Sequence, residues 1–261
     1  MGALGTDADQ TYVGVLREKI VEAIVAAQSA LEPAQIGFGK ANAQGYTATR
    51  RWIYRPDRMA VDPFGNRSVR ATMHAGRNLD DVTGEAGPID PDLSLISIQS
   101  AAGRPIAVLG NFSMHYFGDQ HISADYFGLF AEGLKDRLAA GATGAKAPFV
   151  GMMSHGCSGD IWRRDYRNPN WDVNYTIEAY ANGLLDIAMT IYRSISYKKD
   201  VDLAMVEQRM TIPYRVPDLQ RLEWAKKIVA GMGDRLAKDR TEVYAREQIL
   251  LHERQQTEVV G

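Results

Sequence analysis

The chain has 261 residues, 45% of them hydrophobic, which is enough for a globular core in one large domain or two small ones. Its 30 basic and 32 acidic residues give a formal net charge of -2, so bulk charge does not favour binding to nucleic acid or to an anionic membrane surface. The single cysteine, Cys157, excludes an internal disulfide and an all-cysteine zinc site.

The sequence contains no apolar run of the roughly 18 residues that a membrane-spanning helix needs. Its N-terminus also lacks a basic segment followed by an apolar one. We therefore expect neither a transmembrane segment nor a signal peptide in these residues.

The first third of the chain is expected to contain a helix, a strand and a long turn-rich region. Apolar residues recur at helical spacing from Tyr12 to Leu31 and the pattern ends before Pro33, which predicts a helix. The apolar run 34–38 predicts a short strand. Residues 40–91 are rich in Gly, Pro, Asn, Asp and Arg and show little periodicity. A connection of that length is unusual in a compact domain, so we interpret it as a functional loop region or one that covers a site.

The central region is expected to contain three strands and a helix. Residues 93–99 and 105–112 are expected to form an antiparallel hairpin. A helix capped by Ser123, with Asp125 in its first turn and apolar positions from Phe127 to Leu138, leads to a further strand at 149–153. The strands before and after this helix both run into clusters of His, Asp, Ser and Gly, which is typical of strands that deliver side chains to a site.

The last third predicts mainly helices. Residues 174–194 keep apolar residues on one helical face, and 201–216 read as a strand interrupted by Pro213. Residues 218–238 and 242–255 are charged and amphipathic, so we expect helices that pack on the outside of the domain.

Two histidines follow the strand that ends near Phe112. A neutral imidazole at His115 is a suitable zinc ligand, although zinc needs three or four ligands and a hydrogen-bonded structural histidine is an equal alternative. His121, beside Asp119, is a candidate second ligand or proton shuttle, but an exposed loop histidine is the favoured interpretation.

The sequence SHGCSGD at residues 154–160 predicts a sharp turn after a strand. Its glycines would leave backbone amides free to bind an oxyanion or another anion. A nucleophilic pair of Cys157 with His115 or His155 is conceivable, but a lone cysteine is more often a small buried hydrophobic residue.

Acidic and basic residues near these turns add further candidates. Asp160 and Asp125 are candidates to orient a histidine by accepting its second N–H. Arginines lie in two groups: Arg50, Arg51 and Arg55, and Arg163, Arg164 and Arg167. These arginines either bind a carboxylate or phosphate or are simply solvated.

The segment NFSMHYFGDQHISADYFG, followed by a helix and then by PFVGMMSHGCSGD, resembles the neutral/alkaline ceramidase family. In that family a strand ends in N-x-x-x-H-P, a helix begins with S-A-D-Y/F-x-G, and the next strand leads to a G-D-x-S-P-N turn. The resemblance extends over most of residues 9–195. The family are zinc-dependent amidases that cleave the N-acyl bond of ceramide, in which zinc polarises the amide carbonyl and activates water.

The resemblance implies an α/β fold with mixed β-sheets flanked by helices, as part of a catalytic domain of the neutral ceramidase type. By position, His115 matches a zinc-binding histidine of the family. Ser123, Ala124 and Asp125 match the helix start, and Gly159 and Asp160 match the G-D of the serine turn.

The sequence departs from the family pattern at the serine turn and at the metal site. Trp162 stands in place of the serine that is often assigned as nucleophile, Arg163 and Arg164 replace P-N, and Tyr116 replaces the proline after the histidine. The family's other zinc ligands come from an H-T-H-S motif before the first helix and from a glutamate and a tyrosine well downstream. We therefore expect residues 1–261 to form a single truncated domain with an incomplete zinc ligand set, inactive as this fragment.

We interpret the chain as belonging to a zinc-dependent hydrolase that cleaves a ceramide-like N-acyl amide or a related bond in a small-molecule or lipid substrate. The family implies a secreted or periplasmic protein. The alternatives are a non-catalytic module that binds a lipid or glycan through loops bearing Trp52, Trp162 and Trp171, and, more weakly, a Cys157 thiol hydrolase. The residue assignments are His115 as zinc ligand, Asp160 and Ser158 as catalytic residues, and Gly159, His155 and Arg163 as substrate-binding residues.

Overall fold

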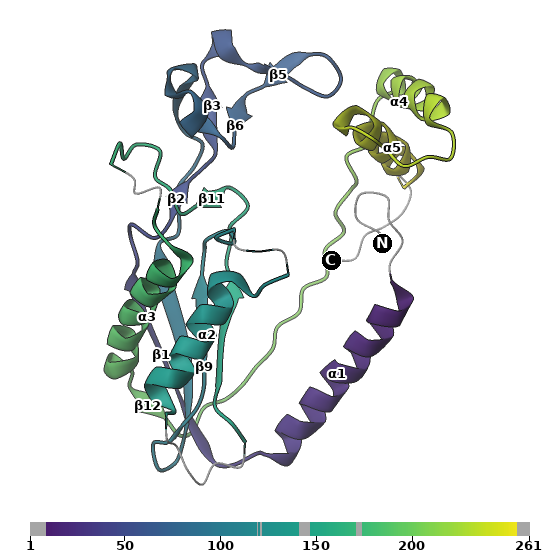
Figure 1. The fold of residues 1–261 in the computed structure, drawn as a ribbon. Helices are drawn as coiled ribbons and strands as arrows, with labels where there is room; N and C mark the ends of the chain where they lie inside the picture. The colour runs from purple at the N-terminus through teal and green to yellow at the C-terminus, as the bar shows by residue number, and fades with distance from the viewer. Residues whose placement is uncertain (1–8, 119, 121, 141–146, 171–173, 255–261) are drawn as a thin grey trace. The chain divides into compact units, whose positions relative to one another are not determined.

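The computed structural model describes residues 9–118, 120, 122–140, 147–170 and 174–254 (Figure 1). The chain divides into two compact units. The sheet unit comprises Val25–Met59 and Val69–Asp202, and the small unit comprises Met1–Ile24, Ala60–Ser68 and Leu203–Gly261. The expectation that residues 1–261 form a single domain stays a prediction.

The main sheet of the sheet unit mixes antiparallel and parallel pairs. Its strand order is β10-β9-β8-β1-β12, and β9 and β10 form its parallel pair, whereas β1–β8, β8–β9 and β1–β12 are antiparallel. The predicted hairpin of β8 and β9 is confirmed, and Gly103 in its turn has a φ of 85°, which favours glycine. The strands are β1 (Ala34–Asn42), β8 (Asp92–Ser100), β9 (Pro105–Phe112), β10 (Val150–His155) and β12 (Tyr197–Lys198).

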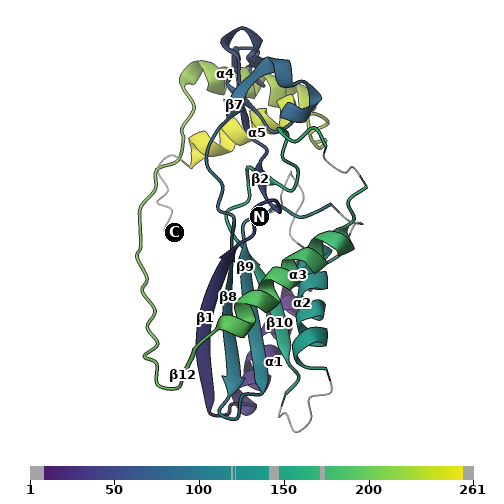
Figure 2. The ribbon, with the colours of Figure 1, turned by 90° about the vertical axis from the view of Figure 1, so that its left-hand side faces the viewer.

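Helices α2 (Asp125–Leu138) and α3 (Ile177–Ser194) pack against each other and cover one face of this sheet (Figure 2). Alternate residues of β8 point into the core, because successive side chains of a strand face opposite sides of the sheet. The α/β fold with mixed sheets flanked by helices is confirmed. Fully buried side chains from the sheet and both helices fill this core: Leu93, Leu95, Val108, Phe112, Tyr126, Phe130, Leu134, Tyr180 and Leu184.

Residues 40–91, expected as a long loop region, begin with the end of β1 and then contain several short strands. Strand β2 pairs with β11, which follows the turn after β10, and β3 pairs with β6 and β7. Turns and 3-10 helices connect these pieces, so the weak periodicity of the sequence reflects strands of two to four residues. The short elements of the sheet unit are β2 (Ala48–Thr49), β3 (Trp52–Tyr54), η2 (Pro56–Arg58), β6 (Ala71–Thr72), η3 (Ala75–Arg77), η4 (Leu79–Asp81), β7 (Val82–Glu85) and β11 (Ile161–Trp162).

The small unit contains two helices that pack on each other, α4 (Leu219–Met232) and α5 (Arg240–Glu253). It also contains most of the hairpin of β4 (Ala60–Val61) and β5 (Arg67–Val69). Both helices were predicted, and so was α1 (Gln10–Ser29), which crosses the boundary between the units and has no buried residue. None of the helices in the described residues is long and apolar enough to cross a membrane.

The prediction of a strand at 201–216 is wrong. This segment forms no strand, and a single bridge residue occurs in it, at Thr211. Leu203 and Val206 are 86% and 93% exposed, so these apolar side chains are not covered. Alternating apolar residues predict a strand only where a sheet edge is available.

The core contact between α2 and the sheet yields a stability prediction. Phe130→Ala removes a ring with 0% exposure, and we expect the free energy of unfolding to fall by about 3–5 kcal/mol. Leu129→Ala, at the neighbouring position of the same helix, removes a side chain with 39% exposure and should cost less than about 1 kcal/mol. Urea unfolding followed by circular dichroism measures both values. Equal losses in the two variants would contradict the packing of α2 described above.

Candidate functional site

The segment that follows β9 is held from several sides. The hydroxyl of Thr47 donates a hydrogen bond to the Ser113 carbonyl (2.9 Å). The Tyr126 hydroxyl (3.1 Å) and Nε2 of His155 (2.8 Å) both approach the Met114 carbonyl, and both must donate because a carbonyl oxygen only accepts. Burial raises the pKa of Tyr126 well above its ordinary value, so its phenol remains a neutral donor. The backbone just before His115 is therefore fixed by Thr47, which precedes β2, and by residues of α2 and β10.

Asp125, the first residue of α2, fixes the other end of the same segment. Its carboxylate accepts backbone N–H groups of Phe117 (2.6 Å) and Gly118 (2.9 Å), and also that of Tyr126 (2.8 Å). The φ of Asp125 is 51°, a left-handed conformation that aspartate tolerates better than most residues. Asp125 therefore binds the backbone of the loop that carries His115.

His115 lies between two aromatic rings. Its ring centroid is 4.1 Å from that of Tyr116 and 5.7 Å from that of Trp162. Nδ1 lies 3.4 Å from the Tyr116 carbonyl oxygen, which only accepts, so Nδ1 carries the proton and Nε2 keeps its lone pair. Burial lowers the pKa of His115, and the positive charge of Arg50 lowers it further. Near neutral pH the imidazole is uncharged, which is the form that binds metals.

Trp162 brings two guanidinium groups close to His115. Pairing of β11 with β2 places Trp162 opposite Ala48. The guanidinium carbon of Arg163 lies 4.6 Å from the centre of the Trp162 ring and 3.9 Å from that of Phe117, and that of Arg50 lies 5.6 Å from the Trp162 ring. Burial lowers the pKa of Arg163, which nevertheless stays cationic. The site is therefore aromatic and positively charged.

The turn after β10 lies beside the segment after β9. The Gly156 N–H donates to the Phe112 carbonyl (3.0 Å), and a Cβ at Gly156 would lie 2.3 Å from the Ser113 hydroxyl oxygen, so only glycine fits. Arg50 holds the far side of the turn, because its backbone N–H donates to the Asp160 carbonyl (2.9 Å) and its guanidinium donates to the Gly159 carbonyl (3.2 Å). Each of these contacts joins parts of the chain that are distant in sequence.

Within this turn, the side chains proposed for chemistry have few contacts. The Ser158 hydroxyl and the Asp160 carboxylate make no hydrogen bond or ion pair to any described residue. Cys157 is exposed, which does not agree with the expectation of a small buried hydrophobic residue. The structure thus brings His115 and Arg163 together around Trp162, and joins the turn at 158–160 to them through Arg50.

A metal centre is not complete among the residues that the structure describes. No group of three or more His, Cys, Asp or Glu side chains in this part of the chain is placed to hold a metal ion. His155 uses Nε2 for the Met114 carbonyl, and the predicted second ligand His121 and its neighbour Asp119 lie outside the described residues. His115 offers one nitrogen, whereas zinc needs three or four ligands. The described residues therefore do not by themselves fit a zinc ion.

Several other candidates have structural partners. Arg55 forms an ion pair with Asp57, and Arg167 forms one with Asp165, so both guanidinium groups already have a carboxylate partner. Trp52 is 8% exposed and donates its indole N–H to the Thr49 carbonyl (3.1 Å), which makes it a core residue. Trp171 lies outside the described residues.

The sequence does not indicate the contacts that Thr47 and Trp162 make with the segment after β9. The β2–β11 pair that brings them to the segment after β9 consists of two residues in each strand, too few to leave a periodic pattern. The roles assigned to His115, His155, Ser158, Gly159, Asp160 and Arg163 stay predictions.

No protein-family model matches this sequence, and no curated protein matches it. Among solved structures, the chain is similar to neutral ceramidase from Pseudomonas aeruginosa, with a TM-score of 0.45 and 17% sequence identity over 68% of this chain and 25% of that chain. A ceramidase complexed with C2 matches with a TM-score of 0.45 and 16% identity over the same shares. The chain thus spans about a quarter of the solved chains it matches. Both solved chains are ceramidases, the kind of protein that the sequence resembles.

The carboxylate of Asp125 yields a second stability prediction. Asp125→Asn preserves size and tolerance of a positive φ, but it replaces one of the two oxygens that accept the Phe117 and Gly118 amides by an N–H₂ group. We expect the free energy of unfolding to fall by about 1–3 kcal/mol. Asp136→Asn, at an exposed position of the same helix, should change it by less than about 0.5 kcal/mol. Urea unfolding that shows no difference between the variants would contradict this role of Asp125.

The environment of His115 predicts an acid-shifted titration. Its imidazole should titrate below the ordinary value of 6.5 in metal-free protein, and Arg50→Met should raise the midpoint without restoring 6.5, because burial is the larger cause. Because the folded-state pKa is lowered, this contribution to stability is present above pH 6.5 and is lost as the pH falls through the lowered pKa. NMR of the His115 ring protons, assigned with His115→Gln, measures the midpoint. A midpoint at or above 6.5 would contradict this partly buried environment.

Proposed function

We propose that this chain is part of a zinc-dependent hydrolase of the neutral ceramidase type, which cleaves an N-acyl amide or a related bond of a lipid or other small molecule. The observation that carries the proposal is the position of His115 just beyond β9, beside β10 and the turn after it. Ligands of α/β proteins commonly bind outside the carboxyl ends of parallel strands, and β9 and β10 are such a pair. The sequence resemblance assigns a zinc-binding histidine to the same position.

The state of the His115 ring supports its role as a metal ligand. Its Nδ1–H faces a backbone carbonyl, and Nε2 remains available, which is the usual arrangement of a metal-binding histidine. Burial and the charge of Arg50 keep the ring neutral. His115 accounts for one of the ligands that zinc needs, so the roles proposed next concern this chain's own residues.

The residues around His115 suit the hydrolysis of an acyl bond. Attack on an amide or ester carbonyl places negative charge on its oxygen, and the guanidinium groups of Arg50 and Arg163, both near the Trp162 ring, are the proposed groups that stabilise that charge. The carboxylate of Asp160 has no partner among the described residues, so it is available to accept a proton. The Ser158 hydroxyl in the same turn is available to hydrogen-bond the substrate. Gly159 and His155 complete the proposed binding surface.

The test uses protein expressed from the full reading frame, with zinc measured by plasma mass spectrometry and fatty-acid release measured from a short-chain ceramide in detergent. We expect His115→Ala to lose most of the zinc and to lower fatty-acid release to background. His74→Ala, which changes an exposed histidine of the sheet unit, should preserve both. Unchanged zinc content and unchanged release in His115→Ala would contradict the proposal.

A second function, non-catalytic binding of a lipid or glycan, is favoured by one observation. Trp162 takes the position of the family serine and packs with Arg50 and Arg163, which is a suitable surface for a polar head group. Saturable binding of the short-chain ceramide, without fatty-acid release and without dependence on zinc, would support this function in place of hydrolysis. A Cys157 thiol hydrolase would instead lose its turnover on treatment with iodoacetamide.

A further inference from the structure

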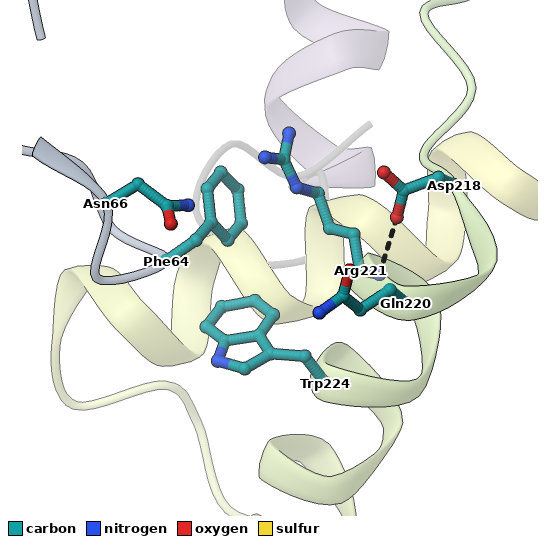
Figure 3. Close-up of a pocket in the computed structure, with 6 residues that line it drawn as sticks. All are labelled: Phe64, Asn66, Asp218, Gln220, Arg221 and Trp224. Atoms are coloured by element: carbon teal, nitrogen blue, oxygen red, sulfur yellow. Dashed lines mark hydrogen bonds between the residues drawn. The ribbon is translucent and has the colours of Figure 1, made fainter. Parts of the chain in front are cut away.

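The small unit contains a cavity of about 570 Å³ between the β4–β5 hairpin and the helices α4 and α5. A second hollow of about 180 Å³ shares Phe64, Asp218 and Arg221 with it (Figure 3). The larger volume falls within the range that small-molecule sites occupy. None of the site residues assigned from the sequence lines either hollow.

Arg221 is held at this cavity by an aromatic group. Its guanidinium carbon lies 3.9 Å from the centre of the Phe64 ring, and Figure 3 shows the two side chains alongside each other. The Phe64 ring is in turn packed by Trp224, with ring centroids 4.9 Å apart, and by Tyr244, at 6.3 Å. Stacking on a ring face orients a guanidinium but leaves its N–H donors at the edge unused. The half-buried Arg221 side chain is therefore held in place with N–H donors available to a ligand.

Two guanidinium groups and three carboxylates line the cavity. Neither guanidinium that lines it, Arg215 or Arg221, makes an ion pair or a side-chain hydrogen bond with any described residue. Two of the lining carboxylates are already engaged by other donors. Asp62 accepts the backbone N–H groups of Phe64 and Asn66 (both 2.9 Å) and the Ser68 hydroxyl (2.8 Å), and Asp218 accepts the backbone N–H of Arg221 (2.7 Å). Glu247 remains as an exposed carboxylate at the rim.

The remaining walls of the cavity include an apolar part. Val216, Pro217, Tyr244 and Leu251 contribute to them, and Pro217 is buried, whereas Ser68 and Gln248 add polar groups. A guanidinium pair beside apolar walls matches a ligand that has an oxyanion at one end and a hydrocarbon body at the other. A free inorganic anion would leave the apolar walls uncovered, and a neutral hydrocarbon would leave the guanidinium groups without a partner.

We propose that this cavity binds a small organic carboxylate, with its oxygens on Arg221 and Arg215 and its apolar body against Val216, Pro217 and Leu251. The site goes beyond the proposed hydrolase and does not depend on zinc or on His115. Arg221 supplies the oriented contact, and Arg215 adds a second positive charge at the same opening.

The experiment is isothermal titration calorimetry of the whole chain at pH 7 with three probes. Benzoate carries both features, benzyl alcohol carries only the apolar body, and inorganic phosphate carries only the anion. We expect benzoate to bind at least about tenfold more tightly than either of the others, because only it satisfies both the guanidinium groups and the apolar walls. Phosphate that binds as tightly as benzoate would show a simple anion site and overturn the proposal.

Matched variants locate the binding. Arg221→Met keeps an apolar stem against Phe64 and removes the charge, and we expect benzoate affinity to fall about tenfold or more. Arg215→Met, at an exposed position where a folding defect is not expected, should also weaken benzoate. Arg246→Met, on α5 but not at the cavity, should bind benzoate as the unchanged chain does. Absence of benzoate binding at millimolar concentration, or equal affinity in all three variants, would overturn the proposal.

Discussion

The carboxylate of Asp125 joins the polar segment after β9 to the first turn of α2, and the candidate site depends on this connection. In a parallel pair of strands the chain must return through a crossover, and here α2 lies in the crossover between β9 and β10. One carboxylate holds the end of the loop and the start of the helix, through the amides of Phe117 and Gly118. The core residues Phe130 and Leu134 then fix the helix on the sheet. His115 is therefore positioned by backbone contacts of its loop and by the rings beside it.

Elements whose apolar residues recur at a regular spacing were predictable from the sequence. The helices α2 and α3 and the β8–β9 hairpin follow from apolar spacing and turn residues, because burial on one face is what creates such patterns. The segment 201–216 shows the limit of this reasoning. Its alternation of apolar residues suits a strand, but a strand also requires a paired neighbour, and only Thr211 of this segment forms a bridge. Local pattern determines which structure a segment suits, whereas tertiary context determines whether it forms.

The candidate site was predictable in part. His115 and the turn at 154–160 were identified because polar residues follow apolar strands, and the structure places these segments side by side through the Gly156 amide. The contacts of Arg50 with the turn at 159–160 and with Trp162 join residues about 110 positions apart, and no pattern in either segment predicts that pairing. Cys157 and Trp52 illustrate the reverse error. Residue type indicated a buried cysteine and a ligand-binding tryptophan, and the structure exposes the cysteine and buries the tryptophan.

The most direct test of this account is whether His115 and Trp162 are in contact in solution. Their ring centroids are 5.7 Å apart, so NMR of the whole chain should show a cross-relaxation peak between their ring protons that disappears in Trp162→Leu. The Tyr46–Tyr180 pair, at 5.5 Å within the same unit, is the internal reference. A His115–Trp162 peak as clear as the reference is the predicted result. A reference peak without a His115–Trp162 peak would show that the two loops do not meet, and the candidate site would not exist as described.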